Sequence, residues 1–216
     1  MKTRFLGYQV PYAEGMRIMR EAIDQIEVEG NQLLLLEHRD TITYTRQHGL
    51  KHVFRTQEEL AQLGIDLFET DRGGDVTFHG TGQLVGYPIL KLSPNWGVVD
   101  YIRALESALV KTCQTLGVSG AHCLPGKTGV WVNNQKLAAI GVGVSQQVTR
   151  HGFALNVSTH LERFTSHMTP CGLEGHGVTS LERELNSSVS ISQVLEIWKT
   201  AETLSSLLAF SGNLLR

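Results

Sequence analysis

Cysteine and proline are scarce in this chain, and charge of one sign does not accumulate. The 216 residues include three cysteines, five prolines and a formal net charge of -2. Cys113, Cys123 and Cys171 are odd in number and show no paired spacing, which argues against the disulfide framework of a small secreted protein. So small a net charge gives no global attraction to nucleic acid or to an anionic membrane. We therefore expect a cytoplasmic protein whose partners are neither nucleic acid nor membrane.

Long hydrophobic runs are also missing. The longest apolar stretches, residues 33–36 and 137–144, are far shorter than the roughly 20 residues of a membrane-spanning helix. The basic start, Met1–Gly7, is not followed by the apolar segment of a signal peptide. With 41% hydrophobic and 19% charged residues, the composition is that of an ordinary globular protein. No repeat or linker divides the chain, so we expect residues 1–216 to form a single domain.

Helix and strand patterns are both present. Apolar residues recur with the spacing of one helix face at about 12–28, at 99–116 and from Ser192 onward. Threonines at the start of capping-box patterns predict short helices after Thr56 and Thr179. Apolar or β-branched runs predict strands at residues 33–37, 41–45, 65–70, 84–92, 130–132, 137–144 and 151–157, the fourth of them broken by Pro88.

The most informative stretch surrounds Cys171. Pro170 fixes the backbone before the thiol, and Gly172 lets another group approach closely after it. A lone cysteine is more often a small buried hydrophobe than a nucleophile. Here His167, His176 and further glycines indicate an open polar loop, in which a core cysteine would be unusual. We therefore interpret Cys171 as a candidate nucleophile.

A second stretch, residues 71–83, holds four glycines between Arg72 and Gly82. Glycines let the main chain approach a ligand, and Arg72 and His79 offer groups that bind anions or form hydrogen bonds. The segment lacks the lysine of a nucleotide-binding P-loop and the glycine spacing of a dinucleotide fold. Residues alone leave two interpretations open, a ligand-binding loop and a pair of turns between strands.

Two further features are weaker. Lys136 follows the predicted turn Asn133–Asn134, a position where most lysines are simply solvated. Small residues, Ala139 and Gly141 on one predicted strand and Gly152 and Ala154 on the next, leave room for a slender apolar ligand or allow tight strand packing. Basic residues at 46–55 are either solvated or a docking site for an acidic partner.

Taken together, these motifs resemble the lipoyl(octanoyl) transferase family. The resemblance is colinear from about residue 30 to 185 and is specific, although Thr81 stands where the family loop usually has proline. The matching segments are Arg72-Gly73-Gly74, His79-Gly80 with Gln83, Gly129-Val130-Trp131-Val132, Lys136, Ala139-Ile140-Gly141, His151 to Asn156, Pro170-Cys171-Gly172 and Val178 to Leu181.

The resemblance implies an α+β fold, a mixed β-sheet flanked by helices and similar to the catalytic domain of lipoate and biotin protein ligases. It also implies transfer of an octanoyl group from octanoyl-acyl carrier protein to a lysine, with no cofactor and no metal. The implied acceptors are the lipoyl domains of 2-oxoacid dehydrogenase complexes and the glycine cleavage H protein.

The resemblance also implies roles for individual residues. Cys171 would carry the acyl thioester and Lys136 would activate it, since a nearby ammonium stabilises a thiolate. The implied substrate-binding residues are Arg72, Gly73, Gly74, Asp75, Val76, Thr77, Phe78, His79, Ala139, Ile140, Gly141, Gly152, Phe153 and Ala154. Gly172 N–H or His79 is a candidate to hold the oxyanion. A Gly152→Val change is expected to shorten the preferred acyl chain.

Three other functions fit parts of the sequence. An ATP-dependent lipoate-protein ligase would share the fold but adenylate its substrate. A zinc-binding interaction module would use His167, Cys171 and His176, although a fourth ligand is not evident. A cysteine hydrolase would need a histidine partner for its thiol, whereas the matched partner is Lys136.

Overall fold

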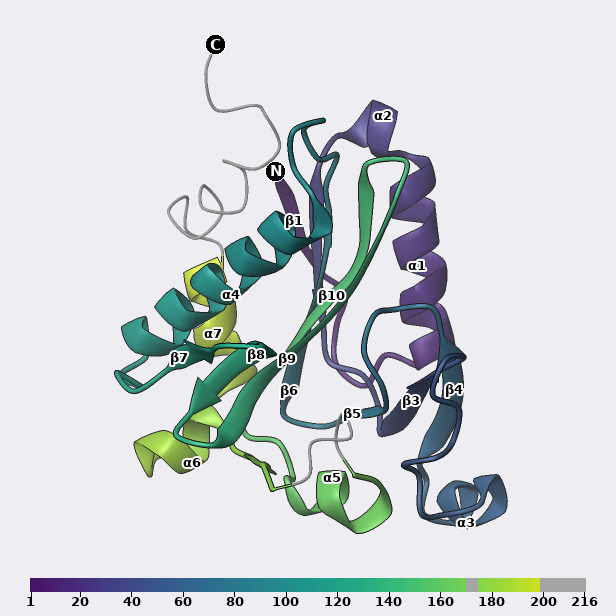
Figure 1. Ribbon diagram of the computed structural model, residues 1–216, viewed down its shortest axis with the longest axis vertical. Coiled ribbons are helices and arrows are strands. Elements are labelled where there is room, and N and C mark those ends of the chain that lie inside the picture. Colours follow the sequence, from purple (N-terminus) through teal and green to yellow (C-terminus); the bar gives the residue numbers. More distant parts are fainter. Residues whose placement is uncertain (170–174, 199–216) are drawn as a thin grey trace.

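A large sheet forms the centre of the molecule. The computed structural model describes residues 1–169 and 175–198, so Cys171 and its neighbours and the predicted helical residues after Trp198 lie outside the described part. The sheet has the strand order β1-β2-β6-β10-β9-β8-β7, and β11 pairs with β9 (Figure 1). The strands are β1 (Lys2–Phe5), β2 (Gln32–Leu36), β6 (Gln83–Ile89), β7 (His122–Leu124), β8 (Lys127–Val132), β9 (Gln135–Ser145), β10 (Val148–Asn156) and β11 (Gly177–Val178).

The sheet is mixed, as the resemblance implied. The β1–β2 and β9–β11 pairs are parallel, and the other neighbours are antiparallel. The turn between β8 and β9 contains Asn133 with a φ of 52°, so the predicted tight hairpin at Asn133–Asn134 is confirmed. This hairpin sets Lys136 near the start of β9.

A smaller sheet of three strands lies beside the large one, with the order β4-β3-β5. Its strands are β3 (Thr41–Thr45), β4 (Asp66–Thr70) and β5 (Thr77–His79). β2 and β3, on either side of His38–Asp40, belong to different sheets and do not form a hairpin. The connection is itself buried at His38, so it turns the chain from one sheet into the other rather than reversing it.

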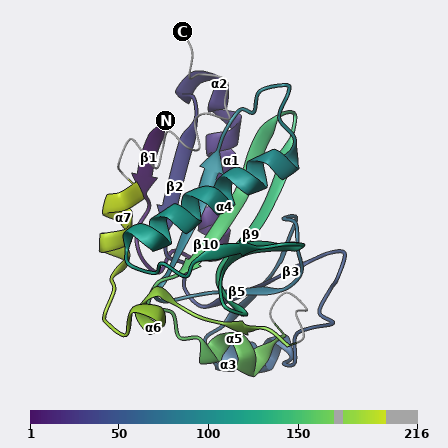
Figure 2. The same cartoon turned by 60° about the vertical axis from the view of Figure 1, so that its left-hand side comes forward.

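Helices cover both faces of the large sheet (Figures 1 and 2). On one face, α4 (Val98–Thr115) and α7 (Ile191–Trp198) bury residues such as Leu105 and Trp198 in the larger apolar core. On the other face, α1 (Tyr12–Asp24) packs Met16 and Met19 against β2 and β6. The predicted helix at 12–28 is interrupted at Gln25, after which α2 (Ile26–Glu29) follows. In the described part of the chain, every helix is too short or too polar to cross a bilayer.

The remaining helices are short. They are α3 (Gln57–Gln62), α5 (Glu162–His167) and α6 (Leu181–Leu185). Thr56 and Glu59 form the predicted capping box of α3, with both hydrogen bonds present. At α6 the capping residue is Ser180, whose hydroxyl accepts a hydrogen bond from the Arg183 N–H, and not Thr179 as the sequence pattern predicted.

Pro88 does not break its strand, because the neighbouring strand adapts to it. β6 continues through Pro88 to Ile89, and its register with β10 ends at Gly86, opposite Phe153. The Thr149 hydroxyl donates to Pro88 O (2.6 Å) and accepts from Leu90 N–H (2.8 Å), so a side chain supplies part of the ladder. Next to this irregularity, His151 has a φ of 57°, which is rare for a residue other than glycine.

Candidate functional site

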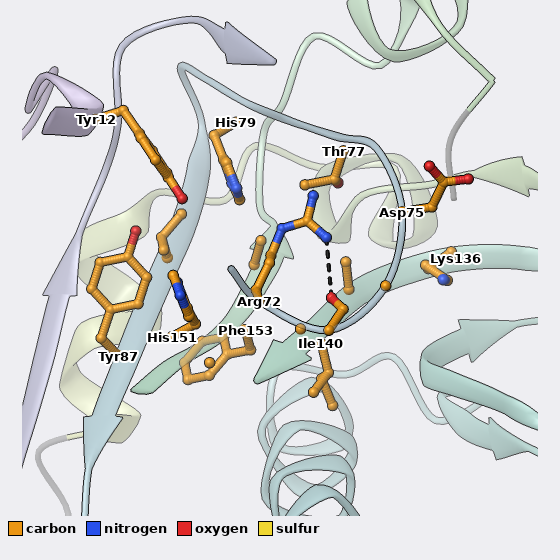
Figure 3. A pocket seen from close by; sticks show the side chains of 17 residues that line it. Tyr12, Arg72, Asp75, Thr77, His79, Tyr87, Lys136, Ile140, His151 and Phe153 are labelled. Atoms are coloured by element: carbon orange, nitrogen blue, oxygen red, sulfur yellow. Dashed lines mark hydrogen bonds between the residues drawn. The ribbon is translucent and has the colours of Figure 1, made fainter. Parts of the chain in front are cut away.

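A cavity lies between the large sheet, α1 and the glycine-rich segment 71–79 (Figure 3). The space between these walls that no atom fills amounts to about 520 Å³, part of which is open solvent. Its walls come from segments as far apart in the chain as Tyr12 and Ala154. The lining residues are Tyr12, Arg72, Gly73, Gly74, Asp75, Thr77, His79, Val85, Tyr87, Lys136, Ala139, Ile140, Gly141, His151, Gly152, Phe153 and Ala154.

The structure brings most of the expected binding residues together around this cavity. All of residues 139–141 and 152–154 line it, as do six of the eight residues from Arg72 to His79. Val76 and Phe78 do not, because they are buried in a separate apolar cluster with Phe164 and Met168. Alternation along β5 sends Thr77 and His79 to the cavity and Phe78 to that cluster. The part of all these expected residues in substrate binding remains a prediction.

Four lining residues were missed by sequence reasoning: Tyr12, Val85, Tyr87 and His151. Tyr12 was assigned to a packing helix, and Val85 and Tyr87 to an apolar strand. No local pattern distinguishes them, since they reach the cavity only through strand order and helix docking. For His151, the unusual φ next to Pro88 turns the side chain, and its Nε2 lies 2.7 Å from Asp71 Oδ1.

The segment 71–79 is fastened across the edge of the cavity. Gly73 N–H donates to Val142 O of β9 (2.9 Å), and a Cβ on Gly141 would come within 2.9 Å of Gly73 O. The Arg72 guanidinium donates to Thr43 O (3.1 Å) and Thr43 Oγ1 (3.0 Å) of the smaller sheet. The segment is therefore a wall of the cavity and more than a pair of turns, and glycine at 141 permits the close approach.

Gly152 plays a different part from the one expected. A Cβ there would lie 2.1 Å from Gly86 O and 2.6 Å from Pro88 Cδ, so a side chain would run into β6. The irregular pairing near Pro88 accounts for this direction. A Gly152→Val change would disturb the sheet rather than protrude into the cavity, and it does not test the acyl chain length.

Lys136 and Asp75 both line the cavity and lie on the same side of it in Figure 3. The Lys136 Nζ lies 4.8 Å from the centroid of the Trp131 ring, a distance at which a cation is attracted to the aromatic face. The His176 ring meets the same indole edge-on at 5.5 Å between centroids. Trp131 is completely buried, so it offers the Lys136 ammonium a fixed surface.

The segment leading to Cys171 runs close to the side of the cavity where Asp75 lies. Thr169, the last described residue before the cysteine, donates its N–H to His52 O (2.9 Å). His52 Nδ1 in turn lies 2.5 Å from Asp75 Oδ2, on the cavity wall. Cys171, the expected nucleophile, lies outside the described residues. Among the basic residues at 46–55, Arg46 and Arg55 pair with Glu69 and Glu59, so much of the charge predicted to attract an acidic partner is balanced locally.

A chain of hydrogen bonds defines the state of His79. The Asn156 amide donates to Thr179 O (2.9 Å), so its oxygen accepts from Gln83 Nε2 (3.0 Å). Gln83 Nε2 also donates to Phe78 O (3.2 Å), which leaves Oε1 to accept from His79 Nδ1 (2.8 Å). Burial, and then the neighbouring His38, lower the pKa of His79 to about 3.

His79 is therefore neutral, with its hydrogen on Nδ1 and a lone pair on Nε2. An oxyanion needs a hydrogen-bond donor. The ring does not supply one from Nε2, so His79 is a poor candidate for the oxyanion role that the sequence suggested.

The proposed zinc site gains no support from the geometry. In residues 1–169 and 175–198, no group of three His, Cys, Asp or Glu side chains is arranged to hold a metal ion.

Comparison with known proteins gives a consistent result. The model of the "Lipoyl protein ligase A/B catalytic domain" family matches residues 11–201. An octanoyltransferase of Koribacter versatilis is 48% identical over 200 residues, which cover 89% of this chain and 78% of the relative. An octanoyltransferase of Bacteroides fragilis is 38% identical over 210 residues, covering 91% and 94%.

Solved structures share the fold at much lower identity. A lipoate-protein ligase A crystallised with ATP superposes with a TM-score of 0.74 at 17% identity, covering 97% of this chain and 86% of the other. A biotin protein ligase of Aquifex aeolicus superposes with a TM-score of 0.59 at 12% identity, covering 98% and 72%. The α+β fold expected from the sequence, with a mixed sheet flanked by helices, is therefore confirmed.

Proposed function

This chain belongs to the lipoyl protein ligase A/B catalytic domain family and is an acyltransferase, and we propose that it carries an octanoyl group from acyl carrier protein to a lysine of a lipoyl domain. Its acceptors would be lipoyl domains of 2-oxoacid dehydrogenase complexes and the glycine cleavage H protein. The observation that carries the proposal is that small residues and Lys136 line the same cavity.

The cavity suits a slender alkyl chain. Ala139 and Ala154 expose little more than backbone and methyl groups along the floor, so a chain can lie flat against the sheet there, while Gly73 and Arg72 lie over Gly141. Each methylene that leaves water contributes about 0.8 kcal/mol. An octanoyl chain therefore binds by burial alone, and its carbonyl end is oriented toward Lys136.

The chemistry needs a thiol and a base at that end. In the proposed first step, the Cys171 thiolate attacks the carrier thioester, the carrier thiolate leaves, and Lys136 returns a proton to it. One thioester replaces another, so no ATP is consumed. In the second step the amine of the acceptor lysine attacks the Cys171 thioester, an amide forms and the Cys171 thiolate is released, while the proton lost by the amine passes to Lys136 and restores its ammonium.

Trp131 supports Lys136 in this role. The indole face attracts the ammonium and limits the positions that the flexible lysine side chain adopts. A lysine on an open surface would lose conformational freedom on reaching the thiol. Trp131 already restricts the Lys136 side chain, so the entropy cost of that step is smaller.

The second candidate is an ATP-dependent ligase. Structures with this activity share the fold at 17% identity or less, which supports the architecture alone. The relatives that are 38–48% identical are named octanoyltransferases. Transfer without ATP would separate the two activities, because a ligase must first adenylate a free acid.

The decisive experiment is intact-mass measurement after mixing the protein with octanoyl-acyl carrier protein and no acceptor. We expect the mass to increase by one octanoyl group in the wild type and in Cys123→Ala, since Cys123 is exposed on another part of the surface. Cys171→Ala should show no adduct. An adduct that persists in Cys171→Ala, or that is lost in Cys123→Ala, would overturn the assignment of the nucleophile.

A second measurement addresses Lys136. Lys136→Ala should lower the rate of adduct formation by at least roughly 100-fold, the usual contribution of a positioned acid or base. Lys91→Ala is the matched control, because Lys91 pairs with Glu27 on the exposed surface. Equal rates in the two variants would remove Lys136 from the chemistry.

A further inference from the structure

Tyr87 stands at the opposite end of the cavity from Lys136 (Figure 3). β6, which carries Tyr87, is separated from β9 by β10, and Gly86 is level with Ile140 through Phe153. Two inter-strand steps of about 4.8 Å and about five residues of 3.4 Å place the two Cα atoms roughly 19 Å apart. Both residues line the cavity, so the distance between them limits the length of what fits there.

The position of the Tyr87 ring is fixed from behind. His38 Nδ1 donates to Val10 O (2.9 Å), because a carbonyl oxygen only accepts, and this leaves Nε2 to accept from the Tyr87 hydroxyl (2.6 Å). Burial lowers the pKa of His38 to about 4, so the ring stays neutral near pH 7 and retains this arrangement. Tyr87 and His38 are 4% and 0% exposed.

Helix α1 closes the space behind His38. A Cβ on Gly15 would lie 2.6 Å from His38 Cε1 and 3.3 Å from Leu36 Cδ1. His38 therefore has no room to retreat toward the helix, and Tyr87 has none to retreat toward His38. The end of the cavity is a rigid wall, although tyrosine and histidine form it.

The polar atoms of this wall are already used. The Tyr87 hydroxyl bonds to His38, and the Tyr12 hydroxyl donates to Thr70 Oγ1 (3.0 Å). An alkyl end that meets the two rings does not have to break either hydrogen bond. The two rings therefore block the end of an alkyl chain, and that end does not need a polar group.

We propose that Tyr87, held by His38 and Gly15, is the residue that sets the length of the acyl chain which this enzyme accepts. The inference deepens the proposed function and rests on it. A chain longer than the distance from the reacting end to the Tyr87 ring has no space to bury its last methylenes. A shorter chain leaves space unfilled and loses burial.

The test compares acyl carrier protein substrates with hexanoyl, octanoyl, decanoyl and dodecanoyl chains. Tyr87→Leu replaces the ring with a smaller apolar group and opens the space as far as His38. We expect the ratio of kcat/KM for decanoyl to that for octanoyl to rise in this variant by roughly fourfold for each additional methylene buried. Tyr87→Phe retains the ring, so octanoyl should stay the preferred chain.

Two further variants test whether the effect is specific to Tyr87. Tyr101 is also completely buried, but it belongs to the core on the α4 face and does not line the cavity. Tyr101→Leu removes a similar volume there and should leave the ranking of chains unchanged. Gly15→Ala should push His38 and Tyr87 inward and favour hexanoyl, and melting temperatures identify any variant that fails to fold.

The outcomes separate the two proposals. If the wild type transfers none of the four chains, the proposed function fails. If the wild type transfers octanoyl and folded Tyr87→Leu keeps the same ranking, or Tyr101→Leu shifts it equally, the role of Tyr87 is wrong. Binding of free decanoate, followed by calorimetry, gives a readout without turnover and should strengthen in Tyr87→Leu.

Discussion

The two faces of the large sheet use alternate residues of the same strands and differ in side-chain volume. Toward α4, β10 buries Phe153 and Leu155, and the Phe153 ring stacks on Trp198 at 4.8 Å between centroids. Toward α1, the same strand offers Ala154, and its neighbour β9 offers Ala139 and Gly141. One face is filled and the other holds a cavity.

The difference shows how a small protein combines stability with a binding site. Large apolar side chains on the α4 face supply burial, at about 25 cal/mol for each Å² of apolar surface removed from water. Small residues on the α1 face give up part of that burial and leave space for a ligand. The faces also differ in their buried titratable groups: His38, His79 and His151 on the cavity side, and Tyr101, Glu106 and Cys113 on helix α4.

The largest effect on stability is expected at Gly152, where the absence of a side chain makes room for β6 and not for a ligand. Gly152→Ala would put a Cβ 2.1 Å from Gly86 O, a contact that only a backbone shift relieves. We expect a loss of about 4 kcal/mol or more in the free energy of unfolding, in the exceptional range for one substitution. Gly120→Ala is the matched control, because its Cβ would meet Val132 at an ordinary 3.7 Å. Similar urea midpoints for the two variants would contradict this account of Gly152.

An intermediate effect is expected from acid. The pKa of His38 is about 4 in the folded protein and about 6.5 when unfolded, so the unfolded state takes up the proton first as pH falls. The free energy of unfolding should be unaffected by this group above about pH 6.5 and should fall by up to about 3 kcal/mol between pH 6.5 and 4.

The measurement is urea unfolding across that pH range for the wild type and His38→Asn. The variant is expected to be less stable near neutral pH, because Tyr87 loses its partner, but to show a shallower decline with acid. Parallel curves would mean that protonation of His38 does not contribute to the acid sensitivity.

The smallest effect is expected along β9, where two glycines of the cavity face have different neighbours. Gly141→Ala would press on Gly73 O at 2.9 Å and displace the segment 71–79, whereas Gly143→Ala would press on Arg150 Nε at 2.7 Å. The backbone at Gly73 is held by a hydrogen bond and cannot easily be displaced, whereas the flexible side chain of Arg150 can move away from the new methyl group. We expect Gly141→Ala to cost about 1–3 kcal/mol and Gly143→Ala less than about 1 kcal/mol. Thermal unfolding and octanoyl transfer rates should rank the variants in the same order, and the reverse order would contradict the wall assigned to this segment.

Most of the elements could be predicted from the sequence because local spacing determines them. The helix at 99–116, the hairpin at Asn133–Asn134 and the capping box at Thr56 each depend on residues a few positions apart. The interruption at Gln25 and the continuous strand through Pro88 were not predictable in this way. The strand continues through Pro88 because the distant residue Thr149 supplies a hydrogen bond there.

The sequence by itself determined which segments could form a site: the glycines after Arg72, the lysine after a tight turn and the small residues of two strands. Only the tertiary structure decided how they meet. Tyr12 and Tyr87 reach the cavity through helix docking and strand order, and His79 becomes neutral because burial removes it from water. Such contacts join residues far apart in the chain, so their geometry follows from sheet register and burial, which no local pattern encodes.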